Sequence, residues 1–348
     1  MSLVLAQSNA ARLAYDLVKG LQAYFVSRLD ELQHPAAAHS SQFYSVDWLR
    51  AQGDFGGGNR FTAKEDTLFN RASVNISQVQ YESDPSKKLG SATALSTIVH
   101  PKNPFAPSMH MHISWTEMKN GSGYWRIMAD LNPSMPDEAQ TALFEKTMRE
   151  TVDALWEEGK AQGERYFYIP ALGRHRGTAH FYLEEYGSQD PVHDRELAKR
   201  FGHAIIDVYI QIVADSLTKH PLFEGRYRDD QLAYHSLYFL QVLTLDRGTT
   251  SGLLVHNEND TGILASLPAE VDKVLLQSWV TRLPSVQAKL LQELINVLNG
   301  DRIALVDDEA KVKIADVSRL FYKNHPEALE LLARGDRIPP TQDNHKSV

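Results

Sequence analysis

The sequence contains no cysteine in its 348 residues. This absence excludes disulfides, thiolate metal sites and cysteine nucleophiles, and it fits a reducing cytoplasm, which is the location we expect. No apolar run reaches the ~18 residues of a membrane span, and the N-terminus lacks the basic and apolar blocks of a secretory signal. There is no basic block either, and the formal net charge is −8, so we expect no nucleic-acid partner.

What is present is the composition of a large globular protein. Hydrophobic residues make up 43% of the chain and charged residues 23%, which suits one large domain or two modest ones. In residues 5–32 the apolar side chains recur every four positions, which predicts an amphipathic helix. Three consecutive glycines in residues 56–59 indicate a flexible turn, because no phosphate-loop or dinucleotide motif surrounds them.

Residues 100–135 predict a β-hairpin. Three X-Pro pairs indicate an entry loop, residues 108–116 and 124–131 alternate as strands, and an Asn-Gly pair lies in the turn between them. One face of the first strand is apolar. Depending on the register, the other face collects two imidazoles, a guanidinium and a carboxylate: His110, His112, Arg126 and Asp130. Such a face is typical of a site, although a solvated face of a half-exposed sheet is the alternative.

The remaining elements are predicted from periodicity and from helix and strand end signals. We expect strands at residues 73–81, 166–169 and 238–245. We expect a helix that begins after Pro133, a long helix at 197–217, and further helices at 286–298, 316–322 and 326–333.

Two motifs have counterparts in a known family. The pattern H-P-x-N-P-x-x-P-[ST]-x-H-x-N-x-R-Y-x-E, followed by G-G-G-x-D-L-T-P, is matched at His100, Pro101, Asn103, Pro104, Pro107, Ser108, His110, Glu117, Asp130, Leu131 and Pro133. The pattern D-R-G-T-x-x-G-L is matched completely by residues 246–253. Over residues 55–268 the chain thus resembles the oxygen-dependent coproporphyrinogen III oxidases.

The chain also departs from that family at positions close to these motifs. His112 stands where the family has asparagine, and Ser114 where it has arginine. Residues 126–128, Arg-Ile-Met, replace three glycines, and Asn132 replaces threonine. The resemblance therefore implies a divergent member that has lost one substrate-binding arginine and gained bulk beside the tetrapyrrole.

The resemblance implies a fold, a reaction and an assembly. The expected fold is α+β, a large antiparallel β-sheet sandwiched between helices, with residues 1–300 as a single domain and 301–348 as a helical C-terminal extension. The expected reaction is the oxidative decarboxylation of two tetrapyrrole propionates to vinyl groups, in haem biosynthesis. It uses O2 as co-substrate and no metal or organic cofactor. The family also forms homodimers.

The resemblance further implies roles for particular residues. Asp130 and His110 are the expected catalytic residues, a carboxylate that faces the pyrrole N–H groups and a proton shuttle. Cations must hold the propionates, because an unpaired carboxylate is costly to bury. The expected substrate-binding set comprises Arg176 and Arg247, Arg126 as a replacement for the lost arginine, and Asn75, Ser77, His112, Asp246 and Gly248.

Two alternatives belong to other functional classes. His110 and His112 with Glu117 resemble a cupin metal motif, to which His175, His180 and Glu184 would add ligands. The odd spacing from His112 to Glu117 opposes a shared face unless a β-bulge intervenes. The other alternative is a diverged paralogue that binds or modifies another substrate, or that binds a tetrapyrrole without catalysis.

Overall fold

The computed structural model describes residues 3–32, 41–223, 225–256, 258–335 and 345. Its centre is a seven-stranded sheet in the order β1-β2-β3-β4-β5-β6-β9, in which every neighbouring pair is antiparallel. The strands are β1 (Phe43–Leu49), β2 (Gly56–Ala63), β3 (Phe69–Gln80), β4 (Leu89–Pro101), β5 (Ser108–Met118), β6 (Gly123–Asn132) and β9 (Ala179–Tyr186). Two-stranded sheets form from β7 (Tyr168–Ile169) with β8 (Arg174–His175), and from β10 (Glu270–Asp272) with β11 (Ile303–Leu305).

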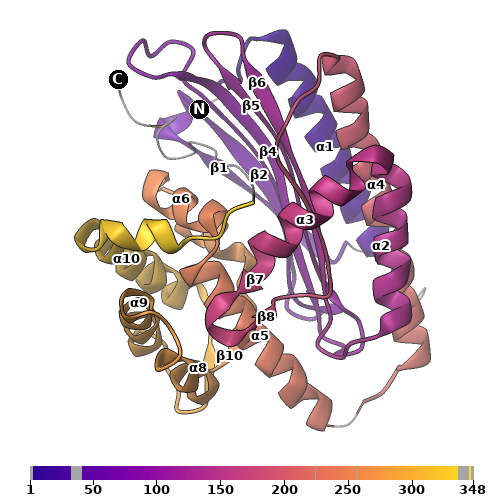
Figure 1. Ribbon diagram of the computed structural model, residues 1–348, viewed down its shortest axis with the longest axis vertical. Helices are drawn as coiled ribbons and strands as arrows, with labels where there is room; N and C mark the ends of the chain where they lie inside the picture. The colour runs from indigo at the N-terminus through magenta and orange to yellow at the C-terminus, as the bar shows by residue number, and fades with distance from the viewer. Residues whose placement is uncertain (1–2, 33–40, 224, 257, 336–344, 346–348) are drawn as a thin grey trace.

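Long helices cover one face of the large sheet (Figure 1). They are α1 (Asn9–Asp30), α2 (Glu138–Val152) and α4 (Pro191–Lys219), while α3 (Trp156–Phe167) packs along β9 at the sheet edge. Met109, Met111 and Ile113 of β5 are fully buried against these helices. The alternation predicted for the hairpin is therefore confirmed, and it leaves the histidines of β5 on the opposite face.

A second group of helices covers the other face (Figure 1). They are α5 (Arg226–Thr244), α6 (Arg247–Val255), α7 (Asp260–Ile263), α8 (Lys273–Val280), α9 (Ser285–Asn296) and α10 (Asp308–Asn324). These helices share a second hydrophobic core that also takes in Ile98 of β4. The predicted α+β fold, a large antiparallel sheet between helices, is thus confirmed. None of the helices in the described residues is both long and apolar enough to cross a membrane.

The C-terminal residues contribute to this second core. β11 pairs with β10, and Ile314 and Phe321 of α10 are buried in the same cluster as Leu240 of α5. The described residues also contain short 3-10 helices: Ala51–Gly53, Asp153–Leu155, Pro170–Leu172, Leu264–Ser266 and Pro326–Leu331. Residues 303–332 therefore share their core with earlier helices, and the division at residue 300 stays a prediction.

The glycine-rich segment at residues 56–59 is part of strand β2 rather than the predicted turn. Its glycines are required by close packing against β1 and β3 on either side. A Cβ on Gly58 would lie 2.7 Å from the indole nitrogen of Trp48, which pairs with it across the strands. Glycine disfavours strands in general, so the prediction followed composition and missed this cross-strand contact.

Two further strand predictions are corrected by the structure. Residues 238–245, predicted as an apolar strand, lie almost entirely in helix α5, which is buried on nearly all sides. A short apolar run does not distinguish a buried helix from a buried strand. Likewise, Tyr166 and Phe167 end helix α3, and only Tyr168 and Ile169 form a strand.

Candidate active site

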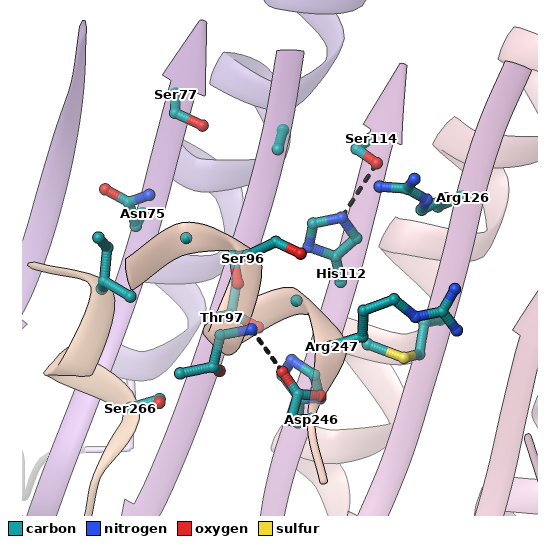
Figure 2. Close-up of a pocket in the computed structure, with 18 of the residues that line it drawn as sticks. Asn75, Ser77, Ser96, Thr97, His112, Ser114, Arg126, Asp246, Arg247 and Ser266 are labelled. Atoms are coloured by element: carbon teal, nitrogen blue, oxygen red, sulfur yellow. Dashed lines mark hydrogen bonds between the residues drawn. The ribbon is translucent and has the colours of Figure 1, made fainter. Parts of the chain in front are cut away.

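A cavity of about 310 Å³ lies between the second face of the sheet and helix α6. The strand register puts His110 opposite Asp130, His112 opposite Met128 and Ser114 opposite Arg126. The predicted common face of the hairpin is therefore confirmed. Figure 2 shows this arrangement, with His112, Ser114 and Arg126 on the sheet and Asp246 and Arg247 at the start of helix α6.

All the predicted site residues except Asp130 line this cavity. They come from three strands, from the segment after β8 and from the start of α6: Asn75, Ser77, His110, His112, Arg126, Arg176, Asp246, Arg247 and Gly248. Small side chains of β4 lie between them, including Ala94 and Ser96, and give the sheet face its hollow centre. Residues separated by more than 170 positions in sequence thus meet at one site.

Asp130 lies behind the cavity wall instead of at the pocket floor where we expected it. Its side chain is fully buried and is not among those that line the cavity. It accepts hydrogen bonds from Arg176 Nη2 at 2.5 Å, from Asn132 Nδ2 at 2.5 Å and from His110 Nδ1 at 3.0 Å. In this arrangement Asp130 reaches the cavity only through His110 and Arg176.

The electrostatics of Asp130 depend on these partners. Burial raises the pKa of a carboxyl group, but the charge of Arg176 and the hydrogen bonds from His110 and Asn132 outweigh it, so the pKa of Asp130 falls below its ordinary range. Burial also opposes the charge of Arg176, but Asp130 more than compensates and raises the pKa of that guanidinium. The two groups form a buried ion pair at neutral pH.

Both predicted propionate clamps, Arg176 and Arg247, reach the cavity with protein partners already in place. Besides Asp130, Arg176 donates to Gln241 Oε1 at 2.6 Å. Arg247 Nη2 donates to the buried Glu184 at 2.7 Å and to the carbonyl of Ala333 at 2.8 Å. Their positive charges are therefore largely balanced, and a substrate carboxylate would compete with these acceptors.

Arg126 has a different environment. Its guanidinium donates to Tyr124 Oη at 3.2 Å and lies 5.3 Å from the centre of that ring. Because Ser114 is directly opposite on β5, Arg126 presents a cation one strand away from the position that lost its arginine. Beside it, His112 Nε2 lies 3.0 Å from Ser114 Oγ. Burial, together with the charges of Arg126 and His110, lowers the pKa of His112 to about 3, so this imidazole is neutral.

Asp246 is the one acidic side chain among the described residues that line the cavity. Its Oδ1 caps helix α6 by accepting from the Thr249 amide at 2.6 Å, and its Oδ2 accepts from Tyr166 Oη at 2.9 Å. The cap explains why a carboxylate precedes this helix, since a helix N-terminus favours negative charge. It also holds one carboxylate at the cavity surface.

Sequence reasoning missed several residues that line the cavity. Tyr166, Tyr182 and Tyr238 come from two helices and from β9, and burial raises the pKa of each of them, so all three remain phenols. Nothing in the local sequence distinguishes these tyrosines from core residues. Ser96 could have been predicted from the alternation of side chains along β4. It lies two residues from Ile98, so both side chains point to the same face, away from the first core.

The further ligands considered for the metal alternative lie away from His110 and His112. Glu117 accepts from Ser8 Oγ at the start of α1, on the side of the sheet away from His112. His175 and His180 both contact Glu164, at 3.0 Å and 3.1 Å, rather than the cavity. Within the described ranges no three histidine or acidic side chains form a group able to hold a metal.

Comparison with known proteins agrees with this fold. The profile of the coproporphyrinogen III oxidase family matches residues 14–297. The oxygen-dependent coproporphyrinogen-III oxidase of Rickettsia bellii is 30% identical over 244 residues, which cover 66% of this chain and 85% of that protein. The protein of the same name from a Synechococcus strain is 28% identical over 307 residues, 76% and 81% of the two chains.

A mitochondrial relative from rat, also described as an oxygen-dependent coproporphyrinogen-III oxidase, is 28% identical over 260 residues. The match spans 65% of this chain but only 56% of the longer rat protein. The fold and the cavity define an α+β protein with an arginine-bearing pocket on one face of its large sheet. More particularly, the chain belongs to the coproporphyrinogen III oxidase family.

Proposed function

We propose that this protein catalyses the oxygen-dependent oxidative decarboxylation of tetrapyrrole propionates, with coproporphyrinogen III converted to protoporphyrinogen IX in haem biosynthesis. For each propionate, the Cα–carboxylate bond breaks to release CO2, a hydrogen leaves the neighbouring carbon, and a vinyl group forms. The two electrons and one proton from this C–H bond, with a second proton from solvent, convert O2 to H2O2. O2 is thus the only co-reactant, and we propose no metal and no organic cofactor.

The observation that carries this proposal is the meeting of Arg126 and Asp246 at one cavity. The guanidinium binds a propionate, and the carboxylate faces the pyrrole N–H groups, where it draws a proton and increases the electron density of the ring. Asp246 takes the role that we first assigned to Asp130, because Asp246 lines the cavity and Asp130 does not.

Asp130 acts as a positioning residue in this proposal. As a carboxylate it accepts from His110 Nδ1, which leaves Nε2 of the same ring as the nitrogen that exchanges a proton with substrate or solvent. It also fixes Arg176, whose guanidinium lies between the rings of Phe167 and Tyr238 at 4.6 Å and 4.8 Å from their centres. Proton transfer at His110 therefore depends on a carboxylate that does not itself line the cavity.

The test of the proposal is aerobic incubation of the purified protein with coproporphyrinogen III, followed by chromatography and mass analysis. We expect loss of two carboxyl groups and formation of protoporphyrinogen IX. Tight binding without turnover would replace the proposal with the non-catalytic tetrapyrrole-binding function. Absence of both binding and turnover would point to another substrate.

The assembly, location and metal content form part of the same proposal. We propose a cytoplasmic homodimer without a catalytic metal. Sedimentation at micromolar concentration tests the dimer, and a monomer there would remove it. Elemental analysis tests the metal. A stoichiometric ion that is lost in His112→Ala would restore the metal alternative.

A further inference from the structure

A second cavity, of about 220 Å³, adjoins the candidate active site. It lies between the end of β1 and the end of α6, and the described residues that line it are Trp48, Leu49, Arg50, Ala51, Phe55, Val255, His256, Glu258 and Asn259. Val255 and His256 line both cavities, so the two spaces are neighbours. Trp48 joins them as well, because its indole nitrogen donates to Asn75 Oδ1 of the main cavity at 3.2 Å.

Arg50 supplies the positive charge of this side cavity. Its guanidinium contacts the imidazole of His256 and lies 5.2 Å from the centre of the Tyr81 ring. Burial, with the charges of Arg50 and His345, lowers the pKa of His256 to about 3, so its imidazole is neutral. In the part of the chain that the structure describes, no carboxylate forms an ion pair with Arg50. This is unlike Arg176 and Arg247, which are each paired with a buried acid.

The nearest acid, Glu258, is exposed on the rim and is already used by the backbone. Its carboxylate accepts from the Ala51 amide at 2.8 Å. That contact supports a strained turn, because Ala51 and Gln52 both have positive φ values, of 46° and 57°. Left-handed backbone at non-glycine residues is strained and persists where the surroundings impose it. The turn therefore holds Arg50 at the cavity at an energetic cost.

We propose that the side cavity is a second carboxylate subsite, in which Arg50 binds a propionate arm of the same tetrapyrrole whose reacting ring occupies the main cavity. This inference rests on the proposed function. A tetrapyrrole with four propionates brings more negative charge than Arg126 can balance, and a guanidinium matches a carboxylate with two parallel hydrogen bonds. The aromatic walls, Trp48 and Phe55, contact the methylene groups of the arm.

The test uses coproporphyrin III, the unreactive oxidised form with four propionates, and its tetraamide, in which every carboxylate is a neutral amide of similar size. Binding of each is followed by porphyrin fluorescence in the wild type and in Arg50→Gln. We expect Arg50→Gln to weaken coproporphyrin III binding about 10- to 100-fold and to leave the tetraamide unchanged. Arg50→Lys keeps the positive charge but cannot donate two parallel hydrogen bonds. Its affinity for coproporphyrin III should therefore lie between those of the wild type and Arg50→Gln.

Arg195→Gln is the matched control, since Arg195 is also partly buried, with 25% of its side chain exposed, but lies on α4 across the sheet. Thermal unfolding of each variant checks folding. If Arg50→Gln weakens both ligands equally, Arg50 is structural and the subsite is overturned. If it weakens neither, the subsite is overturned while the proposed function stands.

Two further outcomes show whether the bound carboxylate is a propionate arm or a free acid, and whether the subsite or the proposed function has failed. Sodium propionate added at the porphyrin's own concentration should not displace it, because a tethered arm outcompetes a free acid. Displacement would show that a free acid occupies the side cavity and would overturn the tethered-arm proposal. If the wild type binds no coproporphyrin III, the proposed function fails and the subsite fails with it.

Discussion

Replacing Asp130 with asparagine tests the buried ion pair that underlies the site. Asp130→Asn keeps the size of the side chain but removes the charge that faces Arg176. Only 1% of the Arg176 side chain is exposed and none of Asp130, so bulk solvent compensates little for the lost partner of the guanidinium. Breaking one partner of such a pair costs ~3–5 kcal/mol, a large part of the ~5–15 kcal/mol that holds a protein folded.

The assay is the free energy of unfolding from urea titrations at neutral pH. The matched control is Glu150→Gln, which removes the exposed pair with Lys146 and should cost under ~1 kcal/mol. Asp130→Asn combined with Arg176→Met removes both buried charges, and we expect it to recover much of the loss. If Asp130→Asn costs no more than Glu150→Gln, the reasoning about this pair is wrong.

The same variant has a defined pH dependence. The pKa of Asp130 is lower in the folded state than in the unfolded chain, so its contribution is fully present above the unfolded value of about 4 and is lost as the pH falls further. The stability difference between wild type and Asp130→Asn should therefore be constant from pH 5 to 8 and shrink below about pH 4. A stability difference between the two proteins that grows on acidification would contradict a lowered pKa of Asp130 in the folded state.

Two further predictions concern the departures from the family. Arg126→Gln should weaken coproporphyrin III binding about 10- to 100-fold in a fluorescence titration, because a charge-assisted hydrogen bond is lost. Ser114→Arg combined with Arg126→Gly returns the cation to β5 and should restore binding; unchanged affinity in Arg126→Gln would reject the replacement idea. His112→Asn should flatten the pH dependence of stability. The pKa of His112 is about 3 in the folded protein and about 6.5 in the unfolded chain. Its contribution to the free energy of unfolding is therefore greatest above pH 6.5, where the imidazole is neutral in both states. That contribution falls by about 1.4 kcal/mol per pH unit on acidification, and parallel curves for the two proteins from urea titrations at pH 7.5 and 5.5 would refute this.

The hairpin face could be predicted because the alternation of residues 108–116 is local information. Apolar side chains at every second position must face a core, so His110 and His112 had to face the other way. The register that brings Ser114 opposite Arg126 was not available, since it depends on how two strands align. The fold class came from the resemblance, because helices on both faces of a sheet leave no unique mark in composition.

The errors have physical reasons of the same kind. The run at residues 238–245 was assigned to a strand because a helix buried on nearly all sides shows no amphipathic period. The burial of Asp130 behind His110 depends on Arg176, 46 positions away in sequence. The side cavity was not predicted at all, since Arg50 and His256 are 206 positions apart and meet only in the folded chain.

The central claim is that the cavity over Asp246 and Arg126 carries out decarboxylation with O2 as the electron acceptor. The most direct measurement is an anaerobic mixture of the protein and coproporphyrinogen III, followed by a pulse of O2 with CO2, H2O2 and vinyl products measured together. We predict no product before the pulse. After it, we expect equal amounts of CO2, H2O2 and new vinyl groups, and none of them with Asp246→Asn. Vinyl formation before O2 is added, or undiminished turnover in Asp246→Asn, would contradict the account.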